Sequence, residues 1–194
     1  MEVLVKTDSS SLIIHEIDPE IYEMLPDIIS NIKDTLLVHP EIKIYGKTAH
    51  QRRSVGFFSD DSIGYKYSGQ LMTSTSLTPG LIYLLQYINE KFNSDYNGIL
   101  VNYYLNGNEY IGKHSDNEKL LKKDVGVCAI SFGAIRKFRI RDKKTNKIIV
   151  DCPTYSNKII QMCGDFQEEF THEIPIEKKV KEGRYSFTFR THDV

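Results

Sequence analysis

The stretch RYSFTFR, residues 184–190, alternates polar and aromatic side chains along its whole length. Successive side chains of a β-strand point to opposite faces, so the three aromatic rings would share one face and mark it as buried. The opposite face would carry two arginines with hydroxyl groups between them: Arg184, Ser186, Thr188 and Arg190. Buried arginines need anionic partners, and their planar groups suit carboxylates. The stretch predicts a strand between a core and a polar pocket, and a solvent-facing edge strand is the alternative.

Short β-branched and aromatic runs also fill the region before this stretch, from residue 99 onward. They are separated by turn-like segments such as NGN at 106–108 and DKKTN at 142–146. The runs are ILVNYYL, VCAISFG, KFRIR, KIIVDC and KIIQMC. Together with RYSFTFR they predict an α+β protein with a β-sandwich or barrel.

Two amphipathic helices are predicted in the first half of the chain. Asp18-Pro19 and Thr78-Pro79 each combine a capping residue with a proline suited to the first helical position. Apolar residues then recur at helical spacing, as Ile21, Leu25, Ile28, Ile29 and Ile32, and as Leu81, Leu84, Leu85, Ile88 and Phe92. Both stripes are expected to face the core, and Pro26 is expected to kink or shorten the first helix.

A metal site is predicted from histidines and a carboxylate on strands. In the extended triplet His114-Ser115-Asp116, the imidazole and the carboxylate point the same way and can grip one ion. His172 lies on a later strand, followed twelve residues later by Arg184. Two histidines and one carboxylate leave three metal positions open, which suits non-haem Fe(II) and dioxygen. A dicarboxylate cosubstrate would chelate the iron at one end and meet an arginine at the other.

Composition favours one packed, reduced domain. The chain of 194 residues is 40% hydrophobic, which argues against disorder. It has no apolar run of about 18 residues, as a membrane span requires, and its N-terminus does not look like a signal peptide. The three cysteines, Cys128, Cys152 and Cys163, form no C-x-x-C pair. We expect core thiols in a cytosolic or nuclear protein without membrane attachment.

The formal net charge of −1 hides two oppositely charged parts. Residues 1–41 hold nine acids and two lysines, whereas residues 42–194 hold 23 basic residues and 17 acids. The densest basic cluster is RKFRIRDKKTNK, residues 136–147, with seven basic side chains and one acid. Such a cluster can neutralise several phosphates and favours nucleic acid as a partner. A solvated strand pair with a lysine-rich turn is the plainer alternative.

Several of these motifs occur together, in order, over roughly residues 42–192. They are N-x-Y (Asn102, Tyr104), H-x-D-x-E (His114, Asp116, Glu118), SFGAIRKFRIR (131–141), His172 and R-x5-R (Arg184, Arg190). With this set the chain resembles the AlkB family of Fe(II)/2-oxoglutarate-dependent dioxygenases, and most of all its members that repair alkylated duplex DNA. As a set, the motifs are highly specific for that family.

The resemblance implies a double-stranded β-helix, or jelly roll, supported by N-terminal helices and fronted by a nucleotide-recognition lid. Residues 1–41 would form an acidic N-terminal extension with a helix, within the same domain. Residues 42–194 would form the dioxygenase domain, with the lid at about 42–76 and the jelly-roll core at about 99–192.

The metal and cosubstrate residues follow from the same resemblance. The iron ligands and catalytic residues would be His114, Asp116 and His172. The residues around 2-oxoglutarate would be Arg184 and Tyr104 at the distal carboxylate, Arg190 and Asn102 near the metal, and Ser186 between the arginines.

The lid residues are assigned in the same way. IYGK at 44–47 resembles a hairpin finger whose residue Tyr45 would wedge into the base stack. Tyr65 and Tyr67 would sandwich the flipped base with His114, and Glu118 would attract a base made cationic by methylation. The full expected set of substrate-binding residues is Tyr45, Arg52, Arg53, Tyr65, Tyr67, Ser68, Glu118, Arg136 and Arg139. For each tyrosine, a plain core or rim aromatic is the alternative.

The resemblance implies oxidative demethylation of N1-methyladenine and N3-methylcytosine in DNA, with Fe(II), 2-oxoglutarate and O2 as cofactor and cosubstrates. The products would be the repaired base, formaldehyde, succinate and CO2. The expected partner is methylated DNA, duplex included, and the expected state is a monomer. The alternatives are an RNA demethylase, the same chemistry on a protein side chain, a nucleic-acid-binding module with a degenerate barrel, and a plain metal-binding jelly roll.

Overall fold

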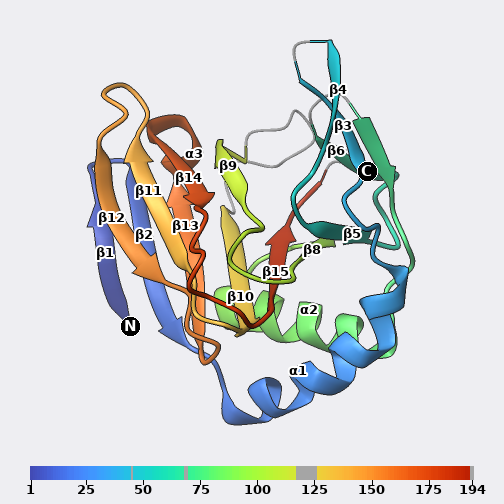
Figure 1. Ribbon diagram of the computed structural model, residues 1–194. Coiled ribbons are helices and arrows are strands. Elements are labelled where there is room, and N and C mark those ends of the chain that lie inside the picture. Colours follow the sequence, from blue (N-terminus) through green and yellow to red (C-terminus); the bar gives the residue numbers. More distant parts are fainter. Residues whose placement is uncertain (45, 68–69, 117–125, 193–194) are drawn as a thin grey trace.

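Two antiparallel sheets enclose a common interior in the computed structural model (Figure 1), which describes residues 1–44, 46–67, 70–116 and 126–192. Within these residues the larger sheet has seven strands. In spatial order they are β1 (Glu2–Lys6), β2 (Ser10–Glu16), β13 (Lys158–Gly164), β10 (Val127–Gly133), β15 (Arg184–Arg190), β8 (Gly98–Tyr104) and β5 (Ser54–Phe58).

The smaller sheet supplies the other wall of this interior. Its strands are β12 (Ile148–Pro153), β11 (Lys137–Asp142), β14 (Phe170–Ile174) and β9 (Ile111–His114). A single-turn helix, α3 (Phe166–Glu169), leads directly into β14. Two antiparallel sheets around one interior form the jelly-roll core that the sequence predicts, and this fold class is confirmed.

The strand β15 lies in the middle of the larger sheet, hydrogen-bonded to β10 on one side and β8 on the other. On its aromatic face, Phe187 and Phe189 are 0% exposed and belong to the main apolar core. Its polar face, from Arg184 to Arg190, lines the cavity between the sheets. The predicted division of the two faces is confirmed, and the edge-strand alternative is wrong because both edges of β15 are paired.

Two helices, α1 (Pro19–Ile32) and α2 (Pro79–Phe92), cover the aromatic side of the larger sheet, at the bottom of Figure 1. A short 3-10 turn, Lys33–Thr35, follows α1. The Thr78 hydroxyl accepts a hydrogen bond from the Leu81 amide, as a cap should. Shortening at Pro26 does not occur, because α1 runs on to Ile32 with its apolar stripe buried. No described helix has the length and hydropathy of a membrane span.

The apolar core has two main parts, one between the helices and the larger sheet and one between the two sheets. All three cysteines are free, as expected. Cys128 and Cys152 are buried in these two parts, whereas Cys163 is partly exposed.

The first two strands were not indicated by the sequence pattern. β1 and β2 form a hairpin, and β2 pairs with β13 along its whole length. Residues 1–41 therefore supply one edge of the larger sheet as well as α1. The apolar runs of this hairpin are short, and the partner that stabilises them lies more than 140 residues away, so local pattern could not identify them.

Two small hairpins lie in the range expected for the lid, 42–76. One is β3 (Glu41–Ile44) with β4 (Lys47–His50), which projects at the top of Figure 1, and the other is β6 (Gly64–Tyr67) with β7 (Gln70–Thr73). Between them, β5 pairs with β8 and so belongs to the larger sheet. Of the described residues in this range, β5 is therefore buried in the larger sheet, whereas the two hairpins lie outside the main sheets.

We expect Phe187→Ala to lower the free energy of unfolding by about 3–5 kcal/mol, because it empties a site at the centre of the core. Phe187→Leu fills most of that volume and should cost less. Tyr83→Ala, at a position of α2 that is 45% exposed, should stay within about 0.5 kcal/mol of wild type. Urea denaturation followed by circular dichroism measures all three, and equal losses for the Phe187 and Tyr83 alanine variants would contradict this packing.

Candidate metal centre and cosubstrate cavity

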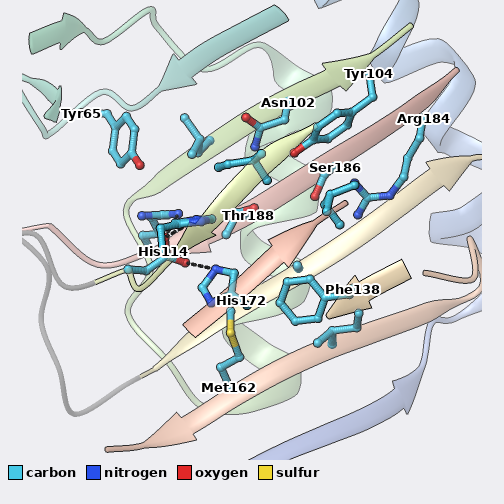
Figure 2. Close-up of a pocket in the computed structure, with 17 residues that line it drawn as sticks. Tyr65, Asn102, Tyr104, His114, Phe138, Met162, His172, Arg184, Ser186 and Thr188 are labelled. Carbon is cyan, nitrogen blue, oxygen red and sulfur yellow. Dashed lines mark hydrogen bonds and ion pairs between the residues drawn. The ribbon is translucent and has the colours of Figure 1, made fainter. Parts of the chain in front are cut away.

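Three metal-ligating side chains meet in the cavity between the sheets (Figure 2). The pairing of β9 with β14 places His114 opposite His172, and the spacing of two residues brings Asp116 to the same side. The possible ligand atoms of the three lie within 4.8 Å of one another. Asp116 is 2% exposed and His172 4%. The two histidines and the carboxylate that the sequence singles out are therefore assembled in space.

Hydrogen bonding prepares His114 to act as a ligand. Its Nδ1 lies 2.8 Å from the carbonyl oxygen of Gly112. Because a carbonyl only accepts, Nδ1 carries the proton, and the lone pair of Nε2 faces the cluster, 3.6 Å from Oδ1 of Asp116. Burial and the neighbouring His172 lower the pKa of His114 to about 3. The ring is neutral at pH 7, as metal ligation requires.

Asp116 is held as a carboxylate. Burial by itself raises its pKa, but Arg190 and His172 outweigh that effect and leave the pKa well below its usual range. Nη2 of Arg190 donates to Oδ1 over 2.8 Å, and Oδ2 lies 3.4 Å from Nε2 of His172. A neutral imidazole and an ionised carboxylate side by side suit a divalent cation, and the second histidine completes the donor set typical of non-haem Fe(II).

A buried cation lies at the other end of the cavity. Arg184 is 3% exposed, and its Nη2 donates to Oγ of Ser131 over 2.8 Å. Within the described residues, its Nε and Nη1 have no hydrogen-bond partner. Burial lowers the pKa of Arg184 to about 10, yet the group remains charged at pH 7. Two unfilled donors on a planar, buried cation match a carboxylate group of a ligand.

The other residues expected at 2-oxoglutarate line the same cavity. The pairing of β15 with β8 places Ser186 opposite Asn102 and Arg184 opposite Tyr104. The Tyr104 ring lies 5.5 Å from the guanidinium carbon of Arg184. Figure 2 shows these side chains on one wall, with the histidines at the far end. The donor set therefore fits a dicarboxylate that reaches from the arginine to the metal centre.

Among the lid residues that the structure describes, Tyr65 is the expected one whose side chain lies in the cavity wall. It is 2% exposed, and its ring lies 5.0 Å from the guanidinium carbon of Arg190. Tyr65 thus packs over the arginine that binds Asp116. Four other lid and pocket expectations fall on side chains outside the described residues, namely Tyr45, Tyr67, Ser68 and Glu118.

The two neighbouring arginines after the first hairpin have different environments. Arg52 is exposed, as a phosphate-binding residue must be. Arg53 is 3% exposed, and its Nε donates to Oδ1 of Asn102 over 2.7 Å. The Arg53 guanidinium is therefore buried against Asn102 and not open at the surface, and its contact with substrate stays a prediction. Its charge lies close enough to His114 to contribute to the low pKa of that ring.

Arg136 is also buried, at 1% exposure, and its contact with substrate stays a prediction. Its Nε donates to Glu177, and its two other nitrogens donate to the main-chain oxygens of Asn106, Glu109 and Pro175. All three nitrogens of the guanidinium therefore take part in joining two loops. Sequence could not show this, because the acceptors are mostly backbone atoms distant in the chain.

The basic cluster at 136–147 is accordingly less open than its composition suggests. Arg139 forms a two-pronged ion pair with Asp151, at 2.7 and 2.8 Å. Arg141 binds Glu173 at 2.9 Å. The exposed basic residues of the cluster are Lys137, on β11, and Lys143, Lys144 and Lys147, in the turn between β11 and β12.

The apolar wall beneath the metal ligands is a feature that the sequence analysis missed. The Phe138 ring lies 5.1 Å from the His172 ring, and Met162 lines the cavity beside them (Figure 2). The alternation in KFRIR, with Phe138 and Ile140 on one face, is the signal that would have located it. This wall keeps the ligand cluster in apolar surroundings.

The amino-acid sequence of this chain is similar to those of known proteins. A sequence model of the 2OG-Fe(II) oxygenase superfamily matches residues 25–190. The human protein named DNA oxidative demethylase ALKBH2 is 26% identical over 156 residues, which cover 77% of this chain and 60% of the relative. The bovine alpha-ketoglutarate-dependent dioxygenase alkB homolog 3 is 31% identical over 121 residues, or 58% of this chain and 42% of the relative.

The fold has a counterpart among solved structures. The structure of OsALKBH1 matches with a TM-score of 0.56 at 15% identity, covering 93% of this chain and 97% of that chain. The chain spans about 60% of the length of the first curated relative. The family match includes all three metal-ligating residues and both arginines of β15. The chain belongs to the 2OG-Fe(II) oxygenase superfamily, and its similarity to ALKBH2 and alkB homolog 3 supports a place within the AlkB family.

Proposed function

We propose that this protein is an Fe(II)/2-oxoglutarate-dependent dioxygenase that removes N-methyl groups from nucleic-acid bases, with N1-methyladenine and N3-methylcytosine in DNA as its substrates. One observation carries the proposal: a buried cluster of His114, Asp116 and His172 shares a cavity with the unfilled donors of Arg184. Membership of the 2OG-Fe(II) oxygenase superfamily supports the same chemistry.

Fe(II) would be held by Nε2 of His114, a carboxylate oxygen of Asp116 and a nitrogen of His172. When bound, the metal supplies the activation of O2 that protein side chains cannot perform. The net reaction uses one oxygen atom of O2 to convert 2-oxoglutarate to succinate and CO2, and the other to hydroxylate the N-methyl group. The resulting N-hydroxymethyl base breaks its C–N bond and releases formaldehyde. The apolar wall of Phe138 and Met162 would limit the access of water.

The arginine face of β15 would bind the cosubstrate. Arg184 would bind the distal carboxylate with its unfilled N–H donors, with Tyr104 beside it. Asn102, Ser186 and Arg190 would hold the end near the metal. Arg190 already binds Asp116 at 2.8 Å, so it would bridge the metal ligand and the cosubstrate.

The substrate side of the proposal depends on the lid. Tyr65, in β6, would form one wall of the base pocket, together with Tyr67, Ser68 and Glu118. The first hairpin would carry Tyr45 as its wedge, with Arg52 near the phosphates. The exposed lysines of the turn between β11 and β12 would add further phosphate contacts. Arg139 would contribute its charge to this surface without binding a phosphate directly, since its guanidinium is paired with Asp151.

DNA is proposed before RNA because the human relative is named DNA oxidative demethylase and carries the longer match. A monomer in the cytosol or nucleus is proposed on the composition and the sequence pattern alone. No observation favours a protein side chain, a purely binding module or another metal enzyme over nucleic-acid demethylation.

The central prediction concerns N1-methyladenine in matched oligonucleotides. Wild-type protein with Fe(II), 2-oxoglutarate and ascorbate should remove the methyl group, and mass spectrometry should show a loss of one CH2 unit. His172→Ala should leave the methyl group in place, because it removes a metal ligand. Single- and double-stranded DNA and RNA should be tested in parallel. A faster reaction on RNA than on DNA would identify RNA as the preferred substrate. Failure to demethylate any of the four nucleic acids would refute nucleic-acid demethylation.

A second prediction concerns the cosubstrate. Arg184→Met should weaken 2-oxoglutarate binding by about 10- to 100-fold, because a charge-assisted pair contributes about 1.5–3 kcal/mol. Calorimetry on Mn(II)-loaded protein without O2 measures the dissociation constant directly. Arg52→Met removes the same charge at an exposed position and should leave that constant unchanged. An Arg184 variant with wild-type affinity would contradict the assignment of the distal carboxylate.

A further inference from the structure

The helix α3 leads directly into β14, the strand that carries the metal ligand His172. It follows β13 and is followed at once by β14, so Gln167 lies five residues before His172. Phe166, at its first position, is 0% exposed and packs on the Phe170 ring at 4.9 Å. The single turn is thus anchored in the core between the sheets.

Polar contacts fix α3 from two further sides. The carboxylate of Glu169 accepts hydrogen bonds from the hydroxyls of Thr7 at 2.7 Å and Ser9 at 3.0 Å. Lys143, on the turn after β11, donates its backbone N–H to the main-chain oxygen of Glu169 and its Nζ to that of Gln167, both over 2.9 Å. A side chain on α3 therefore projects from a fixed support.

The side-chain amide of Gln167 connects the backbone of Asp116 to the side chain of Met162. Its Oε1 accepts the backbone N–H of Asp116 over 2.8 Å, and its Nε2 lies 3.4 Å from the sulfur of Met162 in the cavity wall. A backbone N–H only donates, so the oxygen of the amide must face Asp116. Beside it, the Ser115 hydroxyl donates to the main-chain oxygen of Phe170 over 2.8 Å.

These contacts lie where the sheet no longer holds the chain. β9 ends at His114, and its ladder with β14 fixes the position of that ligand opposite His172. Asp116 lies two residues beyond the strand, so no ladder hydrogen bond positions its backbone. Among the described residues, Gln167 is the side chain that hydrogen-bonds the Asp116 N–H.

We propose that Gln167 is a positioning residue for the metal centre, which holds the backbone of Asp116 so that its carboxylate faces both histidines. The inference rests on the proposed function in one respect, namely that the cluster binds a divalent cation. Residues that orient metal ligands typically contribute about 10- to 100-fold to metal affinity. The role requires only the acceptor oxygen of the amide.

Three variants separate this role from a general loss of packing. Gln167→Leu removes the acceptor, whereas Gln167→Glu keeps an oxygen at the same reach. Gln161→Leu is the matched control, because the Gln161 side chain is hydrogen-bonded too, to His15 at 2.9 Å, but does not line the cavity. The probes are the Mn(II) dissociation constant, measured by calorimetry, and hydrogen exchange of the Asp116 amide in metal-free protein.

Gln167→Leu should bind Mn(II) about 10- to 100-fold more weakly than wild type and exchange the Asp116 amide faster. Gln167→Glu should stay near wild type in exchange and lose far less affinity, and Gln161→Leu should match wild type in both. Equal Mn(II) affinity for wild type and Gln167→Leu would overturn the inference, as would equal losses in the Leu and Glu variants. Absence of Mn(II) binding by wild type would refute the proposed function instead, and the inference with it.

Discussion

Two buried guanidinium groups on one face of β15 impose the constraint around which the site is built. Moving such a charge out of water costs on the order of several kcal/mol unless a partner compensates for it. Arg190 has that partner in Asp116, whereas two nitrogens of Arg184 have none within the described residues. The burial of Arg184, which is 3% exposed, does not stabilise the fold by itself, because two of its nitrogens lack a partner among the described residues. A dicarboxylate ligand explains this burial, because it fills the donors that the fold leaves open.

The opposite face of the same strand provides the rigidity that this arrangement needs. Phe187 and Phe189 are completely buried beneath α1 and α2, and β15 is paired on both sides. The two faces of β15 therefore belong to the apolar core and to the polar cavity, and only the backbone of the strand lies between them. Displacing the core side would displace both arginines, so stability and binding are coupled through β15.

The metal ligands come from two segments that are held by different means. The ladder between β9 and β14 sets His114 against His172, and the hydrogen bond from Nδ1 of His114 to Gly112 turns its Nε2 toward the cluster. Asp116 lies beyond the ladder, and side chains take over: Gln167 holds its backbone and Arg190 its carboxylate. The exposed turn lysines and the two hairpins lie around this centre, where a nucleic-acid strand would have to approach.

The sequence by itself determined the features that depend on local periodicity: the two faces of RYSFTFR, the apolar stripes of both helices, and the spacing that puts His114 and Asp116 on one side of a strand. The motif set also identified the family correctly. Only the tertiary structure decided which charges are free. Arg53 and Arg136 are buried and Arg139 is paired, although their sequence context resembles a nucleic-acid-binding surface. Tyr65 lies over Arg190, and Gln167 binds Asp116, through contacts between segments far apart in the chain. Periodicity shows which face of a strand a residue occupies, but its partner is set by the pairing of distant strands, which a local pattern does not encode.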